Sequence, residues 1–151
     1  MVSQDLIRVR DAEPEDLKAI YRIAQNSFKD PYPLRLLRHI HSTDPEGFLT
    51  AEIKEEIVGY IIGIVRWGDL GHILAIAVKE SHRREGIGSA LIINDLNRLN
   101  KNGADRTRLE VRVSNDPAIN FYDKIGFEAR KTVPGYYSDG EAAISMEYKF
   151  D

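Results

Sequence analysis

Six consecutive apolar residues, running from Ile73 to Val78, constrain the fold of this chain more than any other feature of its sequence. A strand with one face in solvent shows polar residues at alternate positions, whereas a strand covered on both faces is apolar throughout. The run therefore predicts a strand in the middle of a sheet rather than at its edge. It favours an α/β architecture, in which helices cover a central sheet.

The remaining sequence alternates between short strand patterns and amphipathic helix patterns. Pro14 begins the first helix pattern, because proline is tolerated at a first helical residue, and a second follows around residues 34–40. Later helices are predicted at 86–101 and 117–125. We expect a mixed α/β sheet of about seven strands flanked by about four helices. The strands are predicted at residues 7–10, 48–53, 57–67, 72–79, 107–113, 127–133 and 143–150.

The length of 151 residues, with no linker or repeat, predicts a single domain over residues 1–151. The absence of cysteine excludes a disulfide framework, a thiol nucleophile and a Cys-ligated metal. A net charge of −3, from 21 basic and 24 acidic residues, lacks the strongly basic footprint of nucleic-acid binding. No signal-like segment and no apolar run of roughly 20 residues is present, so we expect no membrane association and a cytoplasmic location.

The predicted strand at 72–79 leads into a helix through a basic, glycine-containing turn. Several backbone N–H groups at a helix N-terminus lack partners, and glycines let an anion approach them. The turn therefore favours a pyrophosphate site, although a flexible turn with solvated cations fits its glycines and arginines equally well. Leu91 stands where a dinucleotide-binding fingerprint needs its third glycine. The residues of the turn are Arg83, Arg84, Glu85, Gly86, Ile87, Gly88 and Ser89.

Glu110 and Tyr122 can supply a base and an acid, if the strand at 107–113 lies beside the strand that ends at Val78. A carboxylate can take a proton from an attacking amine, and a phenol can protonate a leaving thiolate. Simpler interpretations stay open for each side chain. Glu110 can form an ion pair with Arg108 or Arg112, and Tyr122 can pack by its ring.

Histidine spacing gives no metal-binding motif, because His39 and His41 point to different sides of a helix and no His-Glu-x-x-His occurs. We therefore expect no metal at any of the four histidines, which include His72 and His82. Ser89 follows Gly88, but Leu91 breaks the Gly-x-Ser-x-Gly pattern of a hydrolase nucleophile.

These motifs together resemble the GCN5-related N-acetyltransferase (GNAT) superfamily. Its cofactor signature, Gln/Arg-x-x-Gly-x-Gly/Ala, is matched by Arg83, Gly86 and Gly88. A second block is similar to the RimI/Ard1 group, which acetylates protein N-termini. That block consists of Leu109-Glu110-Val111-Arg112, Ser114-Asn115, Ala118, Tyr122 and Gly126-Phe127.

The resemblance implies the GNAT fold and acetyl-CoA as cosubstrate. It places the backbone of Ile76, Ala77 and Val78 along the pantetheine arm, with the Val78 N–H as oxyanion donor. The turn from Arg83 to Ser89 would hold the pyrophosphate, and Asn115 and Tyr122 would lie at the pantetheine end. Glu110 takes the position of the general base and Tyr122 that of the general acid.

For the acceptor, the resemblance implies that Tyr136 and Tyr137 line a peptide site, with Phe28 and Tyr32 on its opposite wall. Two departures lie near this acceptor region. Where the group often has Gly-Glu-Asp-Ala, this chain has Gly140-Glu141-Ala142-Ala143, and the first loop lacks a clear Glu-x-Tyr pattern.

We therefore expect direct acetyl transfer in a ternary complex to the α-amino group of a protein or peptide N-terminus. About a tenth of such amines are uncharged near pH 7, against well under about a thousandth of lysines, so a modest base suits them better. Acetylation of a small amine or a lysine, or acyl-CoA binding without catalysis, remains an alternative. Binding of this protein to the ribosome, or a homodimer, also stays open.

Overall fold

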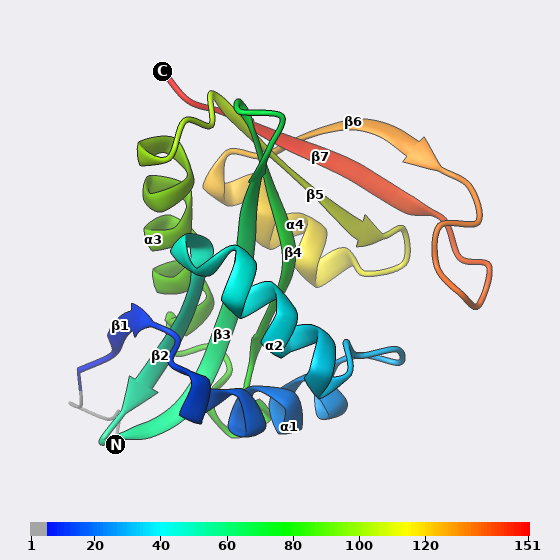
Figure 1. The fold of residues 1–151 in the computed structure, drawn as a ribbon. Helices are drawn as coiled ribbons and strands as arrows, with labels where there is room; N and C mark the ends of the chain where they lie inside the picture. The colour runs from blue at the N-terminus through cyan, green and yellow to red at the C-terminus, as the bar shows by residue number, and fades with distance from the viewer. Residues whose placement is uncertain (1–5) are drawn as a thin grey trace.

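The computed structural model describes residues 6–151, and its seven strands form one sheet in the order β1-β2-β3-β4-β5-β7-β6 (Figure 1). The predicted mixed α/β fold of seven strands and four helices is therefore confirmed. The strands are β1 (Arg8–Asp11), β2 (Phe48–Ile53), β3 (Glu56–Arg66), β4 (Leu70–Val78), β5 (Arg106–Arg112), β6 (Glu128–Val133) and β7 (Ala143–Lys149). The helices are α1 (Leu17–Ser27), α2 (Leu34–Thr43), α3 (Ile87–Lys101) and α4 (Asp116–Ile125).

The apolar run lies in β4, which occupies the middle of the sheet between β3 and β5. Ile73, Ile76 and Val78 pack into the core on the α3 side, while Leu74, Ala75 and Ala77 pack on the α1 and α2 side. A bulge shifts the β3–β4 register after the Ile62–Ala75 pair. The prediction of a central strand covered on both faces is confirmed.

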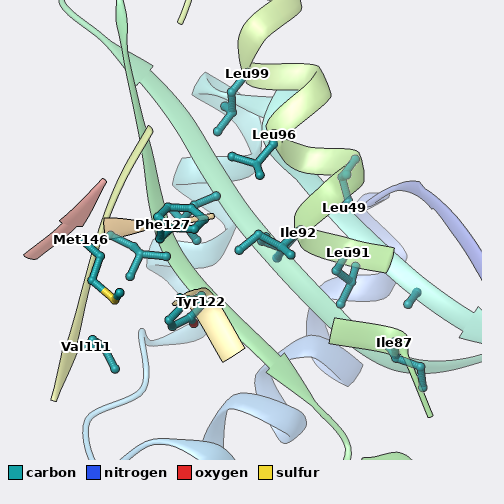
Figure 2. Close-up of a cluster of buried hydrophobic side chains, with 14 of the residues drawn as sticks. Leu49, Ile87, Leu91, Ile92, Leu96, Leu99, Val111, Tyr122, Phe127 and Met146 are labelled. Atoms are coloured by element: carbon teal, nitrogen blue, oxygen red, sulfur yellow. The ribbon is translucent and has the colours of Figure 1, made fainter. Parts of the chain in front are cut away.

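Two apolar cores lie on the opposite faces of this sheet, as the helix patterns predict. α1 and α2 cover one face, and α3 and α4 cover the other (Figure 1). Leu91, Ile92, Leu96 and Leu99 from α3 fill the second core together with Phe127 and Met146 (Figure 2).

Element boundaries differ from the predictions by a few residues, for local reasons. Pro14–Asp16 forms a 3-10 turn, and α1 begins at Leu17. The Asp16 carboxylate there accepts from the Glu13 N–H at 2.8 Å and pairs with Arg10 at 2.7 Å. The β2–β3 turn contracts to two residues, Lys54 and Glu55, whose φ angles of 49° and 66° suit a tight hairpin.

Among the described residues, no helix is both long and apolar enough to cross a membrane.

Asp95 is an acidic residue buried in the apolar core between α3 and the sheet. It lies on α3 with no solvent exposure, and neither of its carboxyl oxygens has a hydrogen-bond partner. It faces β3 at Gly63, where a Cβ atom would come within 2.4 Å of Oδ2, so only glycine fits there. Burial raises the pKa of Asp95 well above its ordinary value.

Asp95→Asn should therefore change how stability depends on pH. The carboxyl holds its proton in the folded state after the unfolded chain has lost it, so wild-type stability falls as pH rises above about 4. The variant cannot ionise, and its stability relative to wild type should increase by up to about 1.4 kcal/mol per pH unit until Asp95 ionises. Urea unfolding between pH 4.5 and pH 8 measures this; a constant difference would contradict the raised pKa.

Candidate active site

The site is organised by the point at which β4 and β5 separate. The two parallel strands pair only at Leu70–Arg106, Gly71–Thr107 and His72–Arg108. Beyond this point, within the part of the chain that the structure describes, β4 continues beside β3 while β5 pairs with β7 along its whole length. The strands diverge (Figure 1), and the last residues of β4 turn one backbone edge away from any neighbouring strand.

Ile76 and Val78 present their backbone groups to this open edge. The Lys79 N–H donates to the Val58 carbonyl at 2.7 Å, so Lys79 faces β3. In an antiparallel pair, alternate residues face the partner strand, which turns Ala77 toward β3 and Ile76 and Val78 away from it. The Val78 carbonyl accordingly accepts from Arg83 Nε at 3.2 Å. Of the three residues expected along the pantetheine arm, two therefore face the gap.

The predicted anion-binding turn lies at the start of α3, directly after β4. Gly86 is the N-cap residue with a φ of 85°, and Arg84 is also left-handed at 66°. No side chain caps the helix, so its first-turn N–H groups have no side-chain acceptor. Ile87 buries its side chain in the core. Gly88 lies next to Phe121, and a Cβ atom added to Gly88 would be 3.4 Å from that ring. The turn thus holds unpaired amide groups close to the open edge of β4.

Glu110 lies on the face of the sheet that α1 and α2 cover, next to the point where β4 and β5 separate. Its Oε1 is 2.7 Å from His72 Nε2 and 3.3 Å from the Tyr136 hydroxyl, which donates to it. Oε2 is 3.1 Å from Arg108 Nε, so the ion pair with Arg108 considered from the sequence is present. The side chain of Glu110 is only 11% exposed.

These neighbours keep Glu110 ionised. Burial by itself would raise the pKa of Glu110, but the hydrogen bond from His72, the charge of Arg108 and the Tyr136 hydroxyl together lower it. Because an ionised carboxylate only accepts hydrogen bonds, His72 Nε2 must carry the hydrogen. His72 Nδ1 is then the second ring nitrogen, and it is buried without a partner.

His72 is a site residue that sequence reasoning missed. It is paired with Arg108 in the β4–β5 register, and Arg108 precedes Glu110 by two residues on the same face. The sequence holds only a weak signal, a histidine directly before the apolar run of the predicted central strand. Its partner becomes visible only when the register is known.

Tyr122 and Glu110 lie on opposite faces of the sheet. Tyr122 packs in the α3-side core, with its ring 5.2 Å from Phe121 and 5.8 Å from Phe127 between centroids (Figure 2). Burial raises the pKa of its hydroxyl, with a further contribution from Tyr137. The Asn115 side chain accepts from the Ala118 N–H at 3.2 Å and caps α4. The two side chains therefore belong to different layers of the fold.

The predicted acceptor residues lie on two loops that touch. Lys29 Nζ is 2.9 Å from Asp139, and the Ser138 hydroxyl donates to Asp30, so the α1–α2 loop meets the β6–β7 loop. Tyr136 and Tyr137 form an edge-to-face pair on the second loop. On the first loop, Phe28 is exposed and Tyr32 is partly buried; burial raises the pKa of Tyr32, and Glu110 adds to the rise while Arg66 opposes it.

The chain is similar in sequence to a known enzyme family. Residues 15–127 match the model of the Acetyltransferase (GNAT) family. The chain belongs to the GNAT family of acetyltransferases. It is 43% identical over 139 residues to an uncharacterised N-acetyltransferase of Methanocaldococcus jannaschii, covering 91% of this chain and 88% of that protein. It is therefore an N-acetyltransferase.

Two further GNAT relatives are similar over nearly their full lengths. An N-alpha-acetyltransferase of Sulfurisphaera tokodaii is 37% identical over 152 aligned positions, covering 92% of this chain and 90% of the relative. The crystal structure of Ard1 from Thermoplasma volcanium superposes with a TM-score of 0.92 at 36% identity, covering 96% of this chain and 98% of that one. The expected resemblance to GNAT enzymes of the RimI/Ard1 group is confirmed.

The sequence departure at Ala142 lies beside a network of charges in this GNAT enzyme. The Ala142 carbonyl accepts from the Val113 N–H at 3.1 Å, which continues the pairing of β5 with β7. The neighbouring carboxylates of Asp139 and Glu141 instead pair with Arg112, at 3.0 Å and 2.8 Å. Sequence reasoning assigned Arg112 only a possible pairing with Glu110, and the structure pairs it with this loop.

Removal of the His72 ring should raise the pKa of Glu110, because His72→Ala deletes a hydrogen-bond donor while Glu110 stays mostly buried. Carboxyl carbon chemical shifts, followed by NMR as a function of pH, report this pKa directly. Wild-type Glu110 should titrate below its ordinary value, and the variant should titrate at higher pH. Equal titration midpoints would show that His72 does not stabilise the ionised form.

Proposed function

We propose that the protein transfers the acetyl group of acetyl-CoA to the N-terminal α-amino group of proteins or peptides, by direct transfer in a ternary complex. The observation that carries this proposal is the position of the Glu110–His72 pair beside the gap where β4 and β5 separate. A base at this place faces an open strand edge on one side and the two tyrosine-bearing loops on the other.

The residues at the gap fit acetyl-CoA as cosubstrate. The unpaired amides at the start of α3 suit a pyrophosphate, and the left-handed Gly86 turns them toward it without a side chain in the way. Ile76 and Val78 offer backbone groups that an extended amide-containing arm can pair with, as a strand would. The rest of the turn, from Arg83 to Ser89, and Asn115 complete this binding set. Acetyl-CoA supplies the activated thioester.

The Glu110–His72 pair would accept the proton that the attacking amine loses as its nitrogen bonds to the acetyl carbon. Glu110 by itself is a weak base, because its neighbours lower its pKa. His72 Nε2–H donates to Glu110 Oε1 and would hold the carboxylate beside the gap. The two groups would act as a unit in which the ring orients the carboxylate that accepts the proton.

Val78 and Tyr122 would assist the breaking of the carbon–sulfur bond. The Val78 N–H points to the open edge and can donate to the carbonyl oxygen as it gains negative charge. Burial raises the pKa of Tyr122, so its hydroxyl keeps its hydrogen and can donate it to the leaving thiolate. Amine and thiolate would then occupy opposite sides of the gap.

Two considerations support an α-amino acceptor. Relatives with the names N-alpha-acetyltransferase and Ard1 cover nearly the whole chain. An α-amine is also far more often uncharged near neutral pH than a lysine, by about two to three orders of magnitude, which suits a weak base. Tyr136 and Tyr137, with Phe28 and Tyr32 opposite, would line the peptide near Glu110.

The test is acetyl transfer to peptides with varied first residues, compared with lysine-containing peptides with blocked N-termini and with small polyamines. Mass spectrometry should place the acetyl group on the α-nitrogen. Glu110→Gln and His72→Ala should each lower kcat by about 100-fold or more, and the double variant should lose little beyond the larger single loss. Tyr122→Phe should lower kcat while leaving the peptide KM within about twofold.

Glu128→Gln is the matched control, since Glu128 lies exposed on β6 away from the gap. Transfer only to lysine or to small amines would contradict the proposed acceptor. Acetyl-CoA binding without transfer to any amine would contradict catalysis.

Gly86→Ala should weaken acetyl-CoA binding by about tenfold or more, because a side chain is strained at a φ of 85° and the turn must shift. Gly68→Ala is its matched control, because Gly68 has a similar φ of 82°, has open space around an added Cβ and lies between β3 and β4, outside the proposed binding turn. Calorimetric titration with acetyl-CoA measures both. Equal affinities in the two variants would show that the turn does not bind the cosubstrate.

A further inference from the structure

Arg112 lies at the end of β5, two residues after Glu110 and on the same face of the strand. Its Nη1 contacts both oxygens of Asp139, at 3.0 and 3.1 Å, and Glu141 Oε1 at 2.8 Å. The guanidinium carbon also lies 4.1 Å from the ring centre of Tyr137. All three partners come from the β6–β7 loop, so one cation from the sheet holds this loop by two carboxylates and a ring.

The two carboxylates are themselves anchored to other segments. Glu141 Oε2 accepts from the Ser114 N–H at 3.1 Å, directly before the residue that caps α4. Asp139 accepts from the Glu141 N–H at 3.1 Å and from Lys29 Nζ on the α1–α2 loop at 2.9 Å. An isolated surface ion pair contributes little to stability, but a shared cation that joins several fixed groups restricts all of them.

The contacts return from Arg112 to the base through the two tyrosines. Tyr137, beneath the guanidinium, meets Tyr136 edge to face at 4.9 Å between ring centres. The Tyr136 hydroxyl then donates to Glu110 Oε1 at 3.3 Å. The chain of contacts therefore leaves β5 at Arg112 and comes back to β5 at Glu110.

We propose that Arg112 is a positioning residue for the acceptor: it fixes the Tyr136–Tyr137 pair against Glu110 and so sets where the amine meets the base. This inference rests on the proposed function. Lysine cannot fully replace Arg112, because an ammonium lacks the planar surface that stacks on the Tyr137 ring.

The kinetic test compares Arg112→Met and Arg112→Lys with wild type. Arg106→Met is the matched control, because Arg106 begins the same strand and pairs with Asp105 at 2.9 Å, away from the loop. Arg112→Met should raise the peptide KM by about tenfold or more and leave the dissociation constant of acetyl-CoA within about twofold of wild type. Arg112→Lys should give an intermediate KM, and Arg106→Met should leave both quantities unchanged.

A second readout follows Glu110 itself in the absence of substrates. The groups that face Glu110 are His72 on β4, Arg108 on β5, Tyr136 on the β6–β7 loop and, at longer range, Tyr32 and Tyr137. Since the Tyr136 hydrogen bond lowers the pKa of Glu110, Arg112→Met should raise this pKa by the same amount as Tyr136→Phe. The double variant should match either single variant, because both changes remove one contact.

An unchanged peptide KM in Arg112→Met, an equal loss in Arg106→Met, or additive effects of the Arg112 and Tyr136 changes on the pKa of Glu110 would each overturn the inference. Should Arg112→Met fail to fold, Arg112→Lys decides by the same two measurements. If wild type acetylates no peptide, the proposed acceptor is wrong, whereas the titration of Glu110 still decides whether Arg112 acts through Tyr136.

Discussion

The short pairing between β4 and β5 is the constraint on which the rest of the site depends. Three residue pairs join the strands, and each strand is then held by its other neighbour, β4 by β3 and β5 by β7. The gap between them is therefore kept open by two antiparallel ladders rather than by a mobile loop. Backbone groups that would otherwise be satisfied within the sheet are left free for a ligand.

The side chains to which we assign the proton transfers come from different layers of the fold. Alternation along β5 sends Glu110 to the α1 and α2 face, while Leu109 and Val111 enter the core on the other face. Tyr122 belongs to α4 and packs in that second core. The proposed base and the proposed proton donor are therefore held on opposite sides of the sheet.

Much of the architecture could be predicted because it follows from local patterns. The apolar run of Ile73–Val78 determines a central strand, and the spacing of Leu91, Ile92, Leu96 and Leu99 determines a helix that covers it. The position of β7 inside the sheet, between β5 and β6, has no such local signal. Strand order and register depend on contacts between residues far apart in the chain.

The same limit applies to the site. Glu110 and the glycine turn are recognised by type and spacing, but the pairing of His72 with Glu110 requires the β4–β5 register. Arg112 was visible in the motif, yet its partners lie 27 and 29 residues away on the β6–β7 loop. The burial of Asp95 becomes visible only in the structure, where its carboxyl packs against Gly63 without a hydrogen-bond partner.

The most direct measurement of the open strand edge is amide hydrogen exchange along the end of β4, with and without acetyl-CoA. The account predicts that the Ile76 and Val78 amides exchange readily in the free protein and become protected when acetyl-CoA binds, whereas the Ala77 amide, turned toward β3, is protected in both states. Slow exchange of Ile76 and Val78 in the free protein, or no added protection on binding, would contradict it.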